Sequence, residues 1–291
     1  MPISEGRVSV TDRGFQFADG VYEVIRVYNG RPFQLTPHLE RLDASLRHIE
    51  LSPPMTLDEM AAVCHEVIRR SGEKECALYV QITRGAAPRL HKFPDPSQVR
   101  PTVVVYNMKV NYVEPEQRRR GVRVITHPDI RWKMCHVKSI ALLPNVLLKN
   151  RALARGAFEA LLYDEHGLVA EGAASNAYCI SNDVLYSAPG GPRILPGVTK
   201  SVVLEEARAL GMTVVEDYQT VDFFKKADEV FLTSTTMEVM PVVQVDDSPI
   251  GGGAETGPWT WRLHEAYQRR IQRECRAENA GTDNDQPRLP V

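Results

Sequence analysis

The amino-acid sequence predicts an α+β protein of two domains. Short strand signals recur along the chain, and helical patterns are segregated between groups of strands, which argues against a single doubly wound sheet. A polar, basic stretch that includes Pro115 and three successive arginines separates a shorter first part from a longer second part. We therefore predict a small N-terminal α+β domain at 1–110, an interdomain linker at 111–121, a larger C-terminal α+β domain at 122–276 and a disordered tail at 277–291.

The first domain is expected to contain a hairpin and two helices. A β-rich run at 21–28 ends at Asn29-Gly30, a dipeptide typical of a two-residue hairpin turn. Thr36, followed by a proline and by leucines at helical spacing, predicts the N-cap of a helix. A second helix is predicted to begin at Thr56, because Glu59 three residues later completes a capping box. Strands are predicted at 76–83 and 102–106.

The second part alternates strands with helices. Short apolar runs predict strands at 122–126, 160–163, 177–180, 214–218, 229–232 and 242–245. Helical spacing predicts helices at 142–157, 199–210 and 258–276. Thr199 stands where a side chain commonly caps a helix, and Gly211 stands where a glycine commonly ends one.

The composition excludes several classes of function. The chain has 291 residues with 35 Lys+Arg against 37 Asp+Glu, so it lacks the positive charge of a nucleic-acid-binding protein. No apolar run approaches the ~20 residues that a membrane span needs, and the first residues lack the pattern of a signal peptide. The five cysteines are scattered and form no CxxC pair, so neither a disulfide framework nor a metal site is expected. These features predict a cytoplasmic protein.

Two ionisable residues lie in surroundings that could give them chemical roles. Lys138 lies within an apolar run, where burial lowers the pKa of a lysine and makes its amine a nucleophile. The alternative is a lysine whose ammonium reaches water along an apolar surface. Glu171 precedes Gly172, Ala173 and Ala174, small residues that let the backbone approach a ligand, so its carboxylate could pair with a bound cation. The alternative is a turn with a solvated glutamate.

Groups that could bind an anion or a carboxylate also recur. The helix start at Thr199 offers backbone N–H groups and a hydroxyl, as nearly every helix start does. The four hydroxyls at 233–236 could add donors to the same anion, or could form a simple Ser/Thr turn. Arg41 lies off the leucine stripe of its helix, and Arg89 and His91 lie in a loop where they could clamp a carboxylate. Each of these three side chains could equally be solvated.

Six segments, taken in chain order, resemble one enzyme family. They are DRGFQFADGVYE (12–23), HLERL (38–42), VKS (137–139), EGAASN (171–176), GVT (197–199) and TSTT (233–236). No single segment is specific, but their order is, and the likeness extends over nearly the whole chain. The sequence resembles the pyridoxal-phosphate (PLP) enzymes of fold type IV, which include branched-chain aminotransferase, aminodeoxychorismate lyase and D-amino acid aminotransferase. The resemblance implies an α+β fold of two domains, a site between the domains, and a homodimer.

Within this class, the D-amino acid aminotransferases are the most similar. The segments VYEVIRVYNG (21–30), TRG (83–85) and PRLHKFP (88–94) carry this likeness. The sequence also departs from their pattern. Ala173 and Ala174 stand where serines are expected, Pro196 stands where a polar residue is common, and Arg26 replaces a lysine-like residue. The alanines and the proline bear on the cofactor's hydrogen bonds and on the side-chain preference.

The resemblance assigns roles to residues of this chain. Lys138 would form the Schiff base with PLP and move the α-proton of the substrate, and Glu171 would pair with the pyridine nitrogen. The other cofactor-binding residues that it implies are Arg41, Leu195, Val198 (through its backbone N–H), Thr199, Ser234 and Thr235. The substrate-binding residues that it implies are Tyr22, Val24, Arg26, Arg89 and His91, among which Tyr22, Arg89 and His91 would hold the α-carboxylate.

The implied reaction is PLP-dependent transamination between a D-amino acid, of the D-alanine or D-glutamate type, and a 2-oxo acid such as 2-oxoglutarate or pyruvate. A branched-chain L-amino acid or (R)-amine aminotransferase, and then aminodeoxychorismate lyase, are the alternatives within the class. Outside it, a PLP-binding protein without turnover would not need a nucleophilic lysine. A hydrolase built on Cys135 and His136 is disfavoured, because adjacent residues of a strand point to opposite faces.

Overall fold

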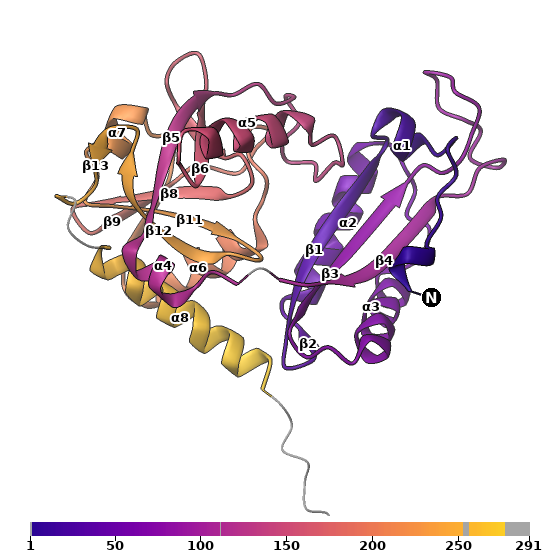
Figure 1. Cartoon of the computed structure of the whole chain (residues 1–291), viewed down its shortest axis with the longest axis horizontal. Helices are drawn as coiled ribbons and strands as arrows, with labels where there is room; N and C mark the ends of the chain where they lie inside the picture. The colour runs from indigo at the N-terminus through magenta and orange to yellow at the C-terminus, as the bar shows by residue number, and fades with distance from the viewer. Residues whose placement is uncertain (1, 111, 253–255, 277–291) are drawn as a thin grey trace, which may run out of the picture.

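The computed structural model describes residues 2–110, 112–252 and 256–276, which form two lobes, each built on its own β-sheet (Figure 1). The first lobe contains a four-stranded sheet and the second a nine-stranded sheet. We propose that these lobes are the two domains that the sequence predicts. The predicted tail at 277–291 lies outside the described residues.

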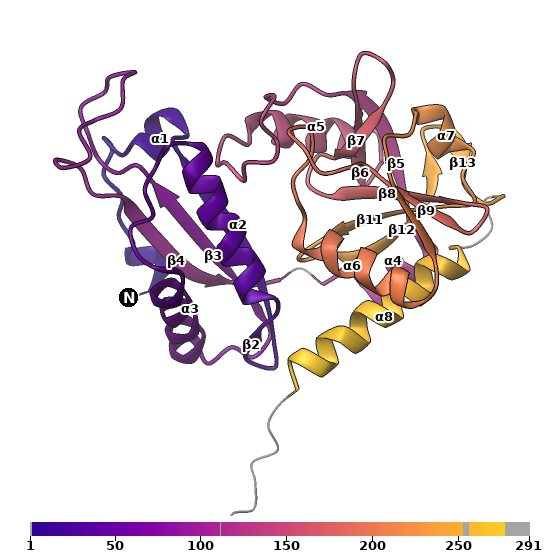
Figure 2. The same cartoon turned by 180° about the vertical axis from the view of Figure 1, so that it is seen from behind.

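The first lobe is an antiparallel sheet covered by helices on one face (Figure 2). Its elements are η1 (Ile3–Glu5), α1 (Arg13–Phe17), β1 (Gly20–Tyr28), β2 (Arg31–Pro32), α2 (Leu35–His48), α3 (Leu57–Ser71), β3 (Cys76–Thr83) and β4 (Thr102–Met108), and the strand order is β2-β1-β3-β4. Val21, Ile25 and Val27 of β1 are buried in one core with apolar residues of α2 and α3. Side chains alternate along a strand, so Tyr22 and its alternate neighbours lie on the opposite face.

The turn and the second helix of this lobe confirm the sequence prediction. Asn29 and Gly30 form the hairpin turn with φ values of 54° and 76°, and Tyr28 pairs with Arg31 across it. The capping box between Thr56 and Glu59 is present at the start of α3.

The predicted N-cap at Thr36 is wrong. The helix α2 begins at Leu35 and its N-cap is Gln34, which has a φ of 54° and makes no side-chain capping bond. The reason is the preceding residue. Phe33 is buried between the lobes, and its N–H donates to the Arg26 carbonyl oxygen at 2.8 Å, so the chain has to turn into the helix directly after it.

The second lobe wraps helices around a mixed sheet. Its elements are α4 (Pro115–Arg120), β5 (Val122–Pro128), α5 (Leu143–Ala154), β6 (Glu159–Tyr163), β7 (Val169–Gly172), β8 (Asn176–Ser181), β9 (Val184–Ser187), α6 (Val198–Ala209), β10 (Thr213–Glu216), α7 (Val221–Lys225), β11 (Glu229–Ser234), β12 (Glu238–Val245), β13 (Ser248–Pro249) and α8 (Pro258–Glu274). The strand order is β10-β9-β8-β11-β12-β5-β6-β7, and β13 pairs with β12.

Several features of this lobe differ from the prediction, among them the helix α7, which was not predicted. The strands β7, β9 and β13 were not predicted, because runs of two to four residues are too short to show a strand period. The helix α4 lies inside the predicted linker. The helix predicted from Thr199 begins at Val198, and its N-cap is Gly197 rather than Thr199.

The two lobes share part of a hydrophobic core. Tyr28 and Phe33 of the first lobe pack in one cluster with residues of α6, β11 and α8, among them Tyr267. The C-terminal part of α8 reaches the first lobe, where the Asn29 side chain donates to the Cys275 carbonyl oxygen at 3.0 Å. These contacts fix the space in which a site between the lobes lies. Among the described residues, no helix combines the length and the apolar character that crossing a membrane requires.

Candidate functional site

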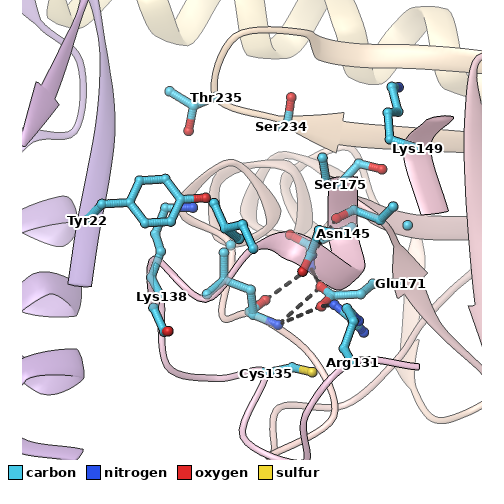
Figure 3. A pocket seen from close by; sticks show the side chains of 18 of the residues that line it. Tyr22, Arg131, Cys135, Lys138, Asn145, Lys149, Glu171, Ser175, Ser234 and Thr235 are labelled. Atoms are coloured by element: carbon cyan, nitrogen blue, oxygen red, sulfur yellow. Dashed lines mark hydrogen bonds and ion pairs between the residues drawn. The ribbon is translucent and has the colours of Figure 1, made fainter. Parts of the chain in front are cut away.

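A cavity of about 370 Å³ lies between the lobes and gathers most of the predicted site residues (Figure 3). Tyr22 and Arg41 line it from the first lobe. The second lobe contributes the other seven predicted residues that reach it, which are Lys138, Glu171, Leu195, Val198, Thr199, Ser234 and Thr235. Residues from distant parts of the sequence therefore converge on one cavity.

Lys138 lies in an irregular segment of the second lobe that is bonded to the first lobe. The Tyr22 backbone N–H donates to the Lys138 carbonyl oxygen at 2.9 Å, and the Lys138 N–H donates to Ser45 Oγ at 3.1 Å. The next residue, Ser139, forms a β-bridge with Val21. Lys138 Nζ lies 4.3 Å from the centre of the Tyr22 ring. The backbone on both sides of the lysine is thus fixed, while its amine projects into the cavity.

Two other reactive side chains of the cavity lining are engaged elsewhere. Lys149 Nζ lies 3.5 Å from the buried carboxylate of Glu159 and also donates to the Phe158 carbonyl oxygen. The Cys135 thiol donates to the Trp132 carbonyl oxygen at 3.1 Å, and burial raises the pKa of this thiol to about 11. A neutral thiol is a poor nucleophile, which argues further against a hydrolase built on Cys135.

Glu171, near the end of β7, is buried, and three groups donate hydrogen bonds to its carboxylate. Its carboxylate accepts from Arg131 Nη1 at 2.5 Å, from Asn176 Nδ2 at 2.9 Å and from the Leu195 N–H at 3.1 Å. Arg131 in turn pairs with Asp129 at 2.8 Å. Burial raises the pKa of the Glu171 carboxyl, and the Arg131 guanidinium opposes that shift. The sequence did not single out Arg131, because nothing in its local pattern marks it as the partner of a residue 40 positions away.

Removing the Arg131 guanidinium should neutralise Glu171. In Arg131→Leu the carboxyl stays buried without its counter-ion, so its pKa rises further and the carboxylate forms only at higher pH. We expect kcat to fall by about 10- to 100-fold near neutral pH and to recover as the pH rises. The measurement is the pH profile of kcat, with Arg131→Lys as the control that should restore most activity. A pH profile of kcat identical to that of the wild type would show that Arg131 does not keep Glu171 ionised.

The N-terminus of α6 lines the cavity with groups that can donate hydrogen bonds to an anion, and we call this part of the lining the anion-binding end. Gly197, its N-cap, has no side chain to cap the helix, so the first backbone N–H groups, including that of Val198, are available to a ligand. A Cβ atom at Gly197 would lie 2.0 Å from Asn176 Oδ1, so only glycine lets the helix start approach β8 this closely. Thr199, Ser234 and Thr235 add hydroxyls to the cavity lining.

Arg41 is held beside the cavity by a buried acid. Its Nε and Nη2 donate to the two carboxylate oxygens of Glu23 at 2.7 and 2.8 Å, and its Nη1 donates to the Pro196 carbonyl oxygen at 2.9 Å. His38 Nδ1 lies 2.8 Å from the same carboxylate. Burial alone would raise the pKa of Glu23, but Arg41 and His38 outweigh it and hold that pKa well below its usual range. Arg41 is therefore fixed in place, with a second N–H on Nη1 left for a ligand.

Four predicted substrate-binding residues do not line this cavity. Val24 lies further along β1. Arg26 is buried in another network, where it donates to the Cys76 carbonyl oxygen at 2.7 Å and lies over the Tyr28 ring. Arg89 and His91 are exposed in a loop of the first lobe, and both pack against the ring of Phe17. Within one chain, none of these four residues belongs to the cavity lining.

The comparisons with known proteins identify the family. The model of amino-transferase class IV matches residues 20–245, which is most of the chain. The chain belongs to amino-transferase class IV. It is 40% identical to a D-alanine aminotransferase of Staphylococcus aureus over 270 residues, covering 92% of this chain and 94% of the relative. It is 41% identical to a D-alanine aminotransferase of Bacillus licheniformis over 271 residues, covering 93% and 94%.

Solved structures of the same class share the fold. A T.th. branched-chain amino acid aminotransferase, solved with pyridoxamine 5'-phosphate, matches with a TM-score of 0.85 and 33% identity over 92% of this chain and 90% of that one. A branched-chain aminotransferase of Thermoproteus uzoniensis matches with a TM-score of 0.81 and 27% identity over the same shares. These matches confirm the fold type that the sequence predicts.

Class IV aminotransferases depend on PLP, and PLP is therefore the cofactor of this enzyme. The residues of the cavity fit it. The uncapped start of α6 and the nearby hydroxyls suit a phosphate, whereas the buried Glu171 carboxylate suits a protonated ring nitrogen. The amine of Lys138 lines the same cavity.

Proposed function

We propose that this class IV enzyme transfers an amino group between a D-amino acid, of the D-alanine or D-glutamate type, and a 2-oxo acid such as 2-oxoglutarate or pyruvate. The observation that carries the proposal is the match to D-alanine aminotransferases at 40–41% identity over 92–93% of the chain. The cavity supports it, because it combines a lysine amine, a buried carboxylate and a set of anion donors. Five buried free cysteines agree with the cytosolic location that we also propose.

The anion-binding end would hold the cofactor's phosphate. In this proposal the donors are the Val198 N–H, the hydroxyls of Thr199, Ser234 and Thr235, and Arg41. The Glu23 carboxylate fixes Arg41, so the guanidinium needs no reorganisation when the phosphate enters.

Glu171 and Lys138 would be the two residues of this chain that take part in the reaction. Bound PLP supplies an electron sink that stabilises negative charge at the substrate's α-carbon. Glu171 would accept the ring N–H and keep that nitrogen protonated, and Leu195 would orient Glu171 through its backbone N–H. Lys138 would hold the cofactor and then carry the α-proton as a general base and acid. The Tyr22 ring, 4.3 Å from Nζ, would limit where the amine can move.

We further propose that the enzyme is a homodimer in which the partner subunit's Arg89 and His91 reach the cavity. Within one chain these residues lie on an exposed loop away from it, so they can bind a substrate carboxylate only if a second copy presents them. Large apolar side chains are exposed on both lobes, as a second copy would require. They are Phe15, Leu90 and Phe93 on the first lobe and Leu143, Val146 and Leu147 on α5.

The branched-chain L-amino acid activity is the second candidate. It is favoured by the 33% identity and the TM-score of 0.85 to the T.th. enzyme. The D-alanine aminotransferases are more similar in sequence over the same share of the chain, so we rank their activity first.

The test is a direct comparison of amino donors with 2-oxoglutarate as the acceptor. Pyruvate release from D-alanine should be fast, and turnover of L-leucine, L-alanine and (R)-1-phenylethylamine should be slow but measurable. Turnover of L-leucine in place of D-alanine would reject the D-amino acid assignment and leave Lys138 and the cofactor unaffected. A lyase of this class needs no 2-oxo acid, so repeated turnover that does not depend on 2-oxoglutarate would reject transamination.

A further inference from the structure

The hairpin formed by the end of β11, the β11–β12 loop at 235–237 and the start of β12 supplies hydroxyls to the cavity, and β12 begins at an unusual residue. Thr233, Ser234 and Thr235 line the cavity, and Ser234 pairs with Glu238 across the hairpin. Glu238 has a φ of 63°, in the left-handed region where a hairpin of this loop length usually has glycine or asparagine. A glutamate is less favourable for this backbone conformation than a glycine, so we expect contacts of its side chain to compensate for that cost.

The Glu238 carboxylate joins three other elements. Its Oε1 accepts from the Tyr28 hydroxyl of β1 at 2.7 Å. Its Oε2 accepts from Gln268 Nε2 of α8 at 2.6 Å and lies 3.7 Å from Arg118 Nη2 of α4. The side chains of Glu238 and Arg118 are only 15% and 10% exposed, so these interactions are weakly screened by water.

Arg118 also holds the backbone on both sides of Glu238. Its Nη1 donates to the Met237 carbonyl oxygen at 3.1 Å and to the Val239 carbonyl oxygen. On the cavity side, the Met237 N–H donates to Ser234 Oγ at 3.3 Å. The contacts therefore run from Tyr28 through the Glu238 carboxylate to Arg118, and from Arg118 through the Met237 backbone to the hydroxyl of Ser234.

We propose that Glu238 is a positioning residue that sets the β11–β12 loop so that Ser234 and Thr235 present their hydroxyls to the cofactor's phosphate. Tyr28 lies on β1, the strand that also carries Tyr22, and its hydroxyl donates to Glu238. The position of the β11–β12 loop is therefore fixed relative to the first lobe as well as to the second. The inference rests on the proposed role of Ser234 and Thr235 as phosphate donors.

The experiment compares two ligands that differ by the phosphate. Dissociation constants of apo protein are measured for PLP and for pyridoxal, which lacks the phosphate. Glu238→Gly removes the carboxylate and suits the positive φ, so the loop can still form but loses its anchor. We expect its Kd for PLP to rise about tenfold, since hydrogen bonds to a charged group are misplaced, and its Kd for pyridoxal to stay unchanged.

Two further variants separate positioning from general stability. Glu238→Gln keeps an acceptor for Tyr28 and should recover part of the PLP affinity. Tyr28→Phe, which removes one hydroxyl, should weaken PLP binding in the same phosphate-dependent way. Its matched control is Tyr186→Phe, because the Tyr186 ring packs on Phe223 and does not line the cavity.

The outcomes distinguish this inference from the proposed function. If Glu238→Gly and Tyr28→Phe bind PLP as the wild type does, or lose PLP and pyridoxal equally, Glu238 does not position phosphate donors and the inference is overturned. If the wild type binds PLP no more tightly than pyridoxal, the phosphate assignment itself fails and the inference fails with it.

Discussion

Replacing Lys138 with alanine should lower the rate of transamination by about 10⁴-fold or more, because the variant loses the amine that we assign to both cofactor attachment and proton transfer. The fold should survive, since the Lys138 backbone, which bonds to Tyr22 and Ser45, is unchanged. The measurement is single-turnover conversion of D-alanine by PLP-saturated protein. Borohydride reduction followed by peptide mass spectrometry should find the cofactor attached at Lys138 in the wild type and at no lysine in the variant.

Lys149 provides the matched control, because it also lines the cavity but pairs with Glu159. A Lys149→Met variant should keep the cofactor attached at Lys138 and should lose far less activity than Lys138→Ala. Full activity in Lys138→Ala, or attachment of the cofactor at Lys149 in the wild type, would reject the assignment of Lys138.

Local sequence patterns predicted the turns and helix caps that depend only on residues close together in the sequence. The Asn29-Gly30 turn and the Thr56 capping box depend on neighbouring residues alone, and both are present. Thr36 failed as an N-cap because burial of Phe33 between the lobes decides where α2 begins, and that burial depends on the second lobe. The residues that the family resemblance implies for the cofactor all line one cavity, although no local pattern could bring Arg41 near Thr199.

The sequence patterns did not predict which residues pair with the buried charged side chains. Glu23 shares the alternation of Val21 and Ile25, which face the helices, and a carboxylate on a buried face needs a cation. The alternation in the sequence therefore indicates that Glu23 needs a buried cationic partner, whereas the structure shows that this partner is Arg41. Arg131 had no such signal, because only the folded chain brings it to Glu171. The sequence also could not show that the Arg89 loop turns away from the cavity of its own chain.

The second large effect is expected at Arg89. In Arg89→Ala the KM for D-alanine should rise by about 100-fold, because a guanidinium that binds a carboxylate with two hydrogen bonds is lost. The KM for a neutral (R)-amine should change much less, since that substrate has no carboxylate. The measurement is the pair of KM values on the same protein preparation. Equal changes for both substrates would show that Arg89 does not bind the carboxylate.

The same variant tests whether Arg89 acts across the dimer. A mixed dimer of an Arg89→Ala chain and a Lys138→Ala chain has one complete site if the arginine comes from the other subunit. The Arg89→Ala chain then supplies Lys138, and the partner subunit's Arg89 completes its cavity. Random co-assembly of equal amounts should restore about one quarter of wild-type activity, since half of the dimers are mixed and each has one intact site of two. If Arg89 served its own chain, no mixed site would be complete, and co-expression would restore nothing beyond the activity of the separate variants. Recovery of activity would therefore show that the enzyme is a dimer and that the arginine that binds the substrate carboxylate comes from the other subunit.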